Sequence, residues 1–110
     1  MNYSIEKTEL QNVAQMALNY DIARALLNMG ELSNEDLHTK IDEYCIKTQT
    51  PRKIVYSLFR YILTGKEVTP SSKQLVDFLG IQEVRNRIRN YMNYLNTILD
   101  MRWIYPEDFK

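Results

Sequence analysis

Apolar residues recur at helical spacing along most of this chain, in five stretches separated by residues that begin or end helices. In the last stretch the apolar side chains follow at intervals of four, three, four and three residues: Val84, Ile88, Tyr91, Leu95 and Ile98. These intervals average close to the ~3.6 residues of an α-helical turn, so the side chains share one face. We therefore predict an all-α fold of about five helices.

Hydroxyl residues, prolines and glycines mark the ends of these stretches. A serine or threonine caps the first turn of a helix, proline is favoured in that turn, and glycine is favoured just after the last turn. The starting signals are Ser4 or Thr8, Ser33, Pro51 and Thr69-Pro70, and the ending signals are Gly30, Gly65 and Gly80. We expect the second helix over about residues 34–46 and the fifth over about residues 82–99, with a possible short strand in the tail.

The composition is that of an ordinary globular protein, with 45% hydrophobic and 25% charged residues. A chain of 110 residues matches one domain, since domains usually hold ~100–150 residues. We therefore predict a single domain over residues 1–110. No apolar run approaches the ~20 residues that a membrane span needs, and residues 1–7 lack a signal-peptide pattern. These features predict a cytoplasmic protein with no membrane partner.

The residues that carry out most enzyme chemistry are scarce. The chain has one cysteine and one histidine, Cys45 and His38. On a helix they would lie two turns apart, beyond hydrogen-bond reach, so a cysteine–histidine catalytic pair is not expected. We predict that Cys45 is a small core residue and that His38 is a surface side chain. No phosphate-binding loop or metal-ligand spacing occurs, so we expect no metal, no cofactor and no enzymatic activity.

The net charge is zero, but the two halves differ. Residues 1–50 contain four basic and eight acidic residues, whereas residues 51–110 contain ten basic and six acidic residues. We interpret residues 1–50 as an acidic helical hairpin, residues 51–99 as a basic three-helix unit and residues 100–110 as a tail. The basic half could bind a polyanion, or the acidic half could simply dock on it.

The order of elements around Gly80 gives a first indication of function. Leu75 and Val76 would face the bundle, Leu79-Gly80-Ile81 would form a turn, and a long polar helix follows. This arrangement resembles helix-turn-helix and winged-helix DNA-binding proteins, with the fifth helix as recognition helix. The interval of four residues from Gly80 to Val84 is shorter than those proteins usually have.

The helix-turn-helix resemblance implies two sets of contacts with duplex DNA. Arginine and asparagine side chains pair with guanine and adenine edges, respectively, in the major groove. The residues that would contact the groove are Arg85, Asn86, Arg89, Asn90 and Asn93. The residues that would contact the phosphate backbone are Ser72, Lys73 and Arg87.

A second resemblance covers residues 53–90. Arg60 is followed by Leu63-Thr64-Gly65, then by Thr69-Pro70, by Leu79-Gly80 and by Arg87-Ile88. This order resembles the C-terminal anticodon-binding helical domain of bacterial glutamyl-tRNA synthetases. The resemblance implies a tRNA partner, with Thr69-Pro70 near the anticodon bases and with Arg60 and Arg87 in structural or backbone-contacting roles.

A protein partner is the third interpretation. The chain has eight tyrosines, a residue type enriched at protein interfaces, and Trp103-Ile104-Tyr105 could dock on another chain or on a second copy. The acidic half could serve as a dimerisation element. We rank duplex DNA first, because small stand-alone proteins use helix-turn-helix modules more often than tRNA-binding fragments. A tRNA-binding domain and a protein-binding adaptor or inhibitor remain the alternatives.

Overall fold

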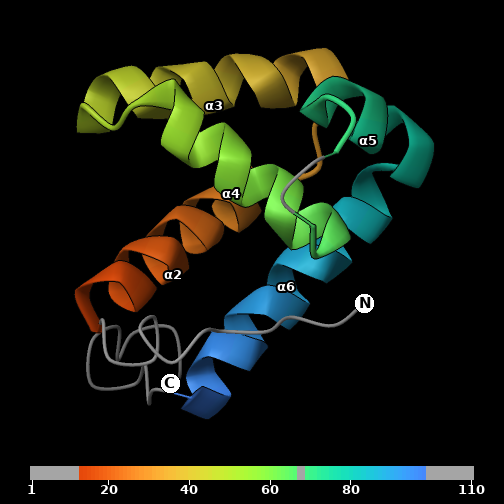
Figure 1. Cartoon of the computed structure of the whole chain (residues 1–110). Coiled ribbons are helices and arrows are strands. Elements are labelled where there is room, and N and C mark those ends of the chain that lie inside the picture. Colours follow the sequence, from red (N-terminus) through yellow and green to blue (C-terminus); the bar gives the residue numbers. More distant parts are fainter. Residues whose placement is uncertain (1–12, 67–68, 99–110) are drawn as a thin grey trace.

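A computed structural model describes residues 13–66 and 69–98 of the chain. These residues form five α-helices (Figure 1): α2 (Val13–Asn28), α3 (Asn34–Thr48), α4 (Arg52–Thr64), α5 (Ser72–Leu79) and α6 (Ile81–Ile98). The described part of the chain contains no strand, and the all-α prediction is confirmed. The expected C-terminal strand and the expected caps Ser4 and Thr8 lie outside the described residues.

The helix ends follow the local signals, with one shift. The Ser33 side chain accepts a hydrogen bond from the Asp36 amide at 3.2 Å, as expected of a helix cap. Helix α5 is capped by Ser71, which forms a capping box with Gln74, and not by Thr69, where we expected the start. Helix α4 ends at Gly65, which takes a positive φ of 72°, a conformation that glycine adopts without steric cost.

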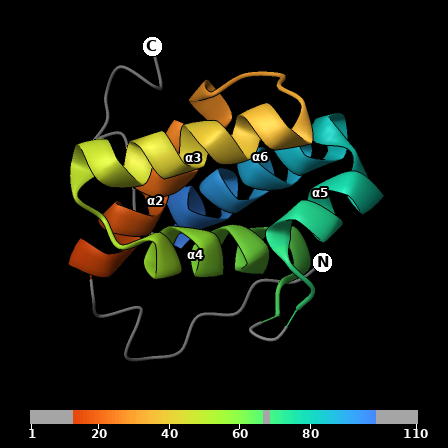
Figure 2. The ribbon, with the colours of Figure 1, turned by 90° about the horizontal axis from the view of Figure 1, so that it is seen from above.

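Helix α6 is the element around which the others pack. It contacts α2, α4 and α5, while α3 lies across the molecule on α4 and α5 (Figures 1 and 2). We expected α2 and α3 to pair as a hairpin, but each makes its main contacts with the C-terminal half. The acidic half of the sequence is therefore docked on the basic half, which was one of the two interpretations of the charge pattern.

The core consists of the apolar faces that the periodicity predicts. Helix α4 contributes fully buried side chains, and four of the five predicted inward residues of α6 are buried, while Ile98 is partly buried. The buried hydrophobic residues are Met16, Tyr20, Ile22, Ala23, Leu26, Leu37, Ile41, Cys45, Val55, Phe59, Ile62, Leu63, Leu75, Val76, Val84, Ile88, Tyr91 and Leu95. The prediction that Cys45 is a core residue is confirmed.

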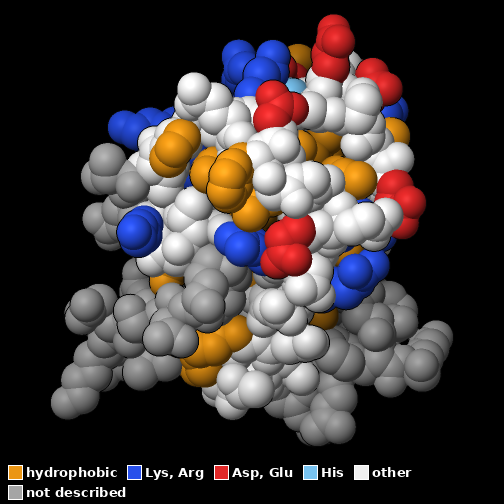
Figure 3. Space-filling model, turned by 90° about the vertical axis from the view of Figure 1, so that its right-hand side faces the viewer, with side chains coloured by type: hydrophobic (Ala, Val, Ile, Leu, Met, Phe, Trp, Pro, Cys, Tyr) orange, Lys and Arg blue, Asp and Glu red, His pale blue; other side chains and the backbone are white. Residues whose placement is uncertain are grey.

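Two side chains differ from what their local sequence suggests. His38, which we expected at the surface, is only 6% exposed, because α5 packs against it and supplies a hydrogen-bond partner. Phe78, part of the apolar pattern of α5, is 87% exposed. An apolar patch surrounded by charged side chains is visible on the face of the molecule on the α5 side (Figure 3).

Within the described residues, no helix is both long enough and apolar enough to cross a membrane.

Candidate nucleic-acid interface

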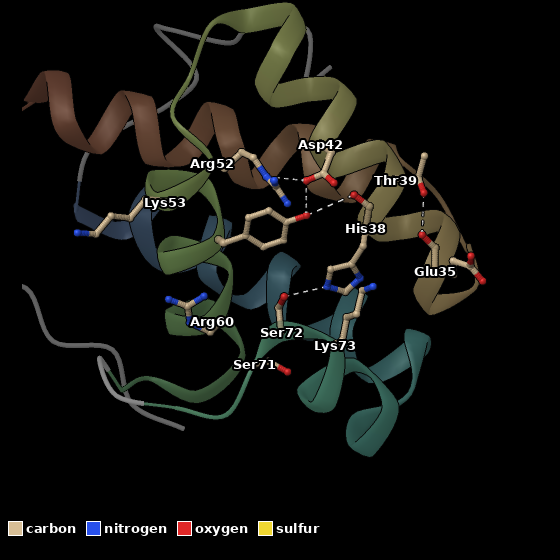
Figure 4. A pocket seen from close by; sticks show the side chains of 11 residues that line it. Glu35, His38, Thr39, Asp42, Arg52, Lys53, Arg60, Ser71, Ser72 and Lys73 are labelled. Carbon is tan, nitrogen blue, oxygen red and sulfur yellow. Dashed lines mark hydrogen bonds and ion pairs between the residues drawn. The ribbon is translucent and has the colours of Figure 1, made fainter.

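A hollow of about 590 Å³ lies between α3, α4 and the first turn of α5 (Figure 4). We call it the α3–α4–α5 hollow. It is lined by Glu35, His38, Thr39, Asp42, Arg52, Lys53, Tyr56, Arg60, Ser71, Ser72 and Lys73. Four of these side chains are basic and two are acidic, so the hollow carries an excess of positive charge.

Three of the basic side chains have no acidic partner among the described residues. Lys53 and Arg60 are seven residues apart on α4, which places them on one face of that helix. Lys73 stands in the first turn of α5, on the facing wall. Arg60 makes one long hydrogen bond, to the Ser57 hydroxyl at 3.4 Å. Each of these three cations can therefore bind an anion such as a phosphate.

The acidic residues of the hollow do not cancel this charge. Arg52 binds Asp42 at 3.1 Å, and the Tyr56 hydroxyl donates to the same carboxylate at 2.7 Å. Burial raises the pKa of Tyr56 to about 12, and the hydrogen bond to Asp42 adds to this effect. Asp42 is thus occupied by neighbours within the hollow, and Glu35 is the remaining acid that lines it.

The floor of the hollow is a chain of hydrogen bonds through His38. Its Nδ1 lies 2.8 Å from the Asn34 carbonyl oxygen, and its Nε2 lies 2.8 Å from the Ser72 hydroxyl. A carbonyl oxygen only accepts, so Nδ1 carries the proton, and in the neutral ring Nε2 accepts from Ser72. Ser72, which we predicted as a backbone contact, is therefore buried with its hydroxyl directed at His38, whereas its neighbour Lys73 is exposed.

The segment before α5 reaches this hollow at Ser71. The Asn34 side chain donates to the Lys73 carbonyl oxygen at 2.8 Å and to Asp77 at 2.7 Å, which ties α3 to α5. Ser71 caps α5 and lines the hollow, and Thr69-Pro70 directly precede it. The two residues that the tRNA synthetase resemblance places near anticodon bases thus directly precede the cap of the helix that carries Lys73.

Two of the predicted contact residues on α6 hold the helix bundle together. Arg85 donates to the Leu27 carbonyl oxygen at 2.8 Å, in the last turn of α2. Arg87 donates to the Leu63 carbonyl oxygen, in the last turn of α4, and to Glu83 at 3.0 Å. Each guanidinium satisfies a carbonyl that a helix end leaves without an intrahelical partner. For Arg87 this agrees with the structural role that the synthetase resemblance implies.

The other predicted contact residues on α6 divide into two groups. Arg89 and Asn93 line a second hollow together with residues of α2, whereas Asn86 and Asn90 are exposed and line neither hollow. All four of these side chains are exposed on one face of α6, whereas Arg85, the fifth predicted groove contact, is bonded to α2. The connection from α5 to α6 is the single residue Gly80, whereas a helix-turn-helix has a turn of ~3–4 residues.

The comparison with protein families identifies the class of domain. The family described as anticodon binding domain matches residues 2–92, which is most of the chain. The chain belongs to this family of anticodon-binding domains. The searches of curated proteins and of solved structures found no match.

The family match supports the second resemblance of the sequence analysis, and the helix-turn-helix resemblance is not shown. The match also covers the N-terminal half, where sequence reasoning found no motif. Sequence reasoning also missed Lys53 as a candidate contact. The seven-residue interval from Lys53 to Arg60, on the face of α4 away from its apolar residues, is the signal that could have indicated it.

Proposed function

We propose that the chain binds the anticodon loop of a tRNA and that it acts as a binding module without a reaction of its own. The observation that carries this proposal is the family match over residues 2–92. The α3–α4–α5 hollow adds support, because three of the cations that line it have no acidic partner among the described residues. This proposal replaces duplex DNA as the first choice of partner.

The geometry suggests how the loop would be held. Lys53, Arg60 and Lys73 would bind phosphates of the loop, which position the RNA without reading its sequence. Thr69-Pro70, directly before the cap of α5, would contact bases that are splayed out of the loop, since RNA is read mainly at unpaired bases. The backbone contacts predicted for Lys73 are thus retained with a different nucleic acid as partner.

One observation supports a binding role over catalysis. Cys45 is buried and His38 is hydrogen-bonded on both ring nitrogens, so neither is placed as a nucleophile or free base.

The direct test is fluorescence anisotropy with labelled tRNA and labelled duplex DNA over ~50–200 mM salt. We expect tRNA to bind more tightly than DNA, with an affinity that falls as salt rises. The double change Lys53→Glu with Arg60→Glu should weaken tRNA binding at least ~10-fold and reduce the salt slope by ~0.7 for each lost phosphate contact.

The matched control is Lys40→Glu with Lys47→Glu, because both lysines are exposed on α3 and line neither hollow. This double variant has the same change in net charge and should retain most of the affinity. Equal losses in the two double variants would show a general charge effect and would contradict the proposed interface. Tighter binding to duplex DNA than to tRNA would contradict the proposed function itself.

A further inference from the structure

We infer that the hollow between α2 and α6 binds a single unpaired nucleotide of an RNA. The inference rests on the proposed function for the class of its partner. This α2–α6 hollow has a volume of about 320 Å³ and is lined by Tyr20, Arg24, Leu27, Asn28, Arg89, Met92 and Asn93. It shares no lining residue with the α3–α4–α5 hollow, so it is a separate contact. Its volume is at the lower end of the ~300–1,000 Å³ of small-molecule sites, which suits one nucleotide.

The charged side chains of the α2–α6 hollow are both arginines. Arg24 binds Asp21 at 3.1 Å and is 26% exposed in its side chain, so its position is fixed by a neighbour on the same helix. Arg89, on the opposite wall, is exposed and makes no ion pair with any residue in the described ranges. A guanidinium binds a phosphate through two parallel hydrogen bonds, so Arg89 is placed to bind the phosphate of a nucleotide.

The amide side chains favour a base as the rest of the ligand. Asn28 projects from α2 and Asn93 from α6, and neither amide has a hydrogen-bond partner among residues 13–66 and 69–98. Each amide offers both a donor and an acceptor, as the edge of a base requires. A peptide carboxylate only accepts, and it would leave both amide oxygens without a partner. Tyr20, Leu27 and Met92 supply an apolar floor for the face of the ring.

The surroundings of Arg89 and Asn93 also favour an unpaired nucleotide over a duplex. These residue types suit base recognition, which is why the sequence pattern selected them for a DNA groove. In the structure α2 forms the other wall of the same hollow. A duplex groove is read by a helix that projects from the protein surface, whereas a single unpaired base can enter a hollow between two helices.

The test that needs no tRNA uses nuclear magnetic resonance of the isotope-labelled chain. The side-chain amide signals of Asn28 and Asn93 are followed while each of the four ribonucleoside 5′-monophosphates is added to ~10 mM, which suffices for a ligand with a Kd of ~1 mM. We expect both signals to shift with at least one nucleotide. The variant Arg89→Ala with Asn93→Ala should weaken the remaining Asn28 response at least ~5-fold.

Two results would overturn the inference. One is the absence of any shift at Asn28 and Asn93, or shifts at Asn28 that persist unchanged in the double variant. The other is a shift with an acidic hexapeptide and none with nucleotides, which would assign the hollow to a protein partner.

A second measurement connects the hollow to tRNA. Arg89→Ala with Asn93→Ala should weaken tRNA binding ~10-fold, whereas Gln82→Ala, an exposed amide of α6 that lines neither hollow, should leave it unchanged. If the unaltered chain binds no tRNA, the proposed function fails, and the nucleotide titration still decides whether the hollow is a nucleotide site. Equal tRNA affinity of the double variant and the unaltered chain would overturn the contact with tRNA.

Discussion

Tyr56 lies where α3 and α4 meet, and its hydroxyl is held by groups that are distant in the sequence. It donates to Asp42 at 2.7 Å, and the His38 carbonyl oxygen lies 3.3 Å away. The Tyr56 ring stacks on the His38 ring with 5.8 Å between the two ring centroids. The guanidinium carbon of Arg52 lies over the Tyr56 ring, 5.6 Å from its centroid. A single side chain therefore orders the wall of the α3–α4–α5 hollow.

The raised pKa of Tyr56 predicts a pH dependence of stability. Its pKa is about 12 in the folded chain against an ordinary value of 10.0. Because the folded state holds the proton more tightly, the stabilisation is fully present below pH 10 and is lost as the pH rises towards 12. Tyr56→Phe should lower the free energy of unfolding by about 1 kcal/mol at pH 8, and the difference should shrink above pH 10.

Urea denaturation of both proteins at several pH values measures this difference. A gap between the unaltered chain and Tyr56→Phe that stays constant from pH 9 to pH 12 would contradict the prediction.

At the scale of secondary structure, helix α6 secures the ends of two neighbours. Arg85 reaches the last turn of α2 and Arg87 the last turn of α4, from positions two residues apart that point to different sides of α6. The positive charge also complements the negative end of each helix dipole. Two of the arginines that the sequence pattern assigned to nucleic acid are thus used within the fold.

Removal of one of these arginines should cost stability. Arg87→Met keeps most of the aliphatic stem but leaves the Leu63 carbonyl oxygen without its donor, so we expect a loss of about 1–3 kcal/mol in the free energy of unfolding. Arg89→Met is the matched change at an exposed arginine of the same helix and should stay within about 0.5 kcal/mol. Urea denaturation measures both variants. Equal effects would show that the Arg87 contact contributes nothing specific.

At the scale of the whole molecule, both halves of the chain contribute to one core. Cys45 of α3 belongs to the same buried cluster as Val84 of α6, although the two residues come from the acidic and the basic half. Cys45 is 3% exposed, and burial, assisted by the nearby Asp42 charge, raises the pKa of its thiol. Its reactivity therefore reports on the opening of the core.

The Cys45 thiol should react with a disulfide reagent only when the core opens. For a domain with a stability of ~5 kcal/mol, the open fraction predicts labelling roughly 10³–10⁴-fold slower than in the urea-unfolded chain. The rate should rise with urea in step with the loss of helical circular dichroism. Native labelling as fast as in urea would mean that α3 opens without the rest of the core.

The sequence by itself determined the helices, most of their ends and the side chains of the core. These features depend on interactions within a few residues: the helical period of α6, the Ser33 cap and the glycine at the end of α4. The order of residues around Leu63-Thr64-Gly65 also carried the resemblance to anticodon-binding domains. The family match favours the nucleic-acid resemblance that we ranked second, and the residue types of α6 did not distinguish the two because they suit both nucleic acids.

The tertiary structure decided which polar side chains remain available for a partner. Arg87 donates to a carbonyl oxygen 24 residues away, and Arg85 donates to one 58 residues away. His38 is hydrogen-bonded to a serine hydroxyl 34 residues away. Lys53 and Arg60 remain free because the described residues place no acid beside them. No local pattern contains this information, since the partners of a side chain depend on which helices pack together, and a helix presents the same residues whether or not another helix covers them.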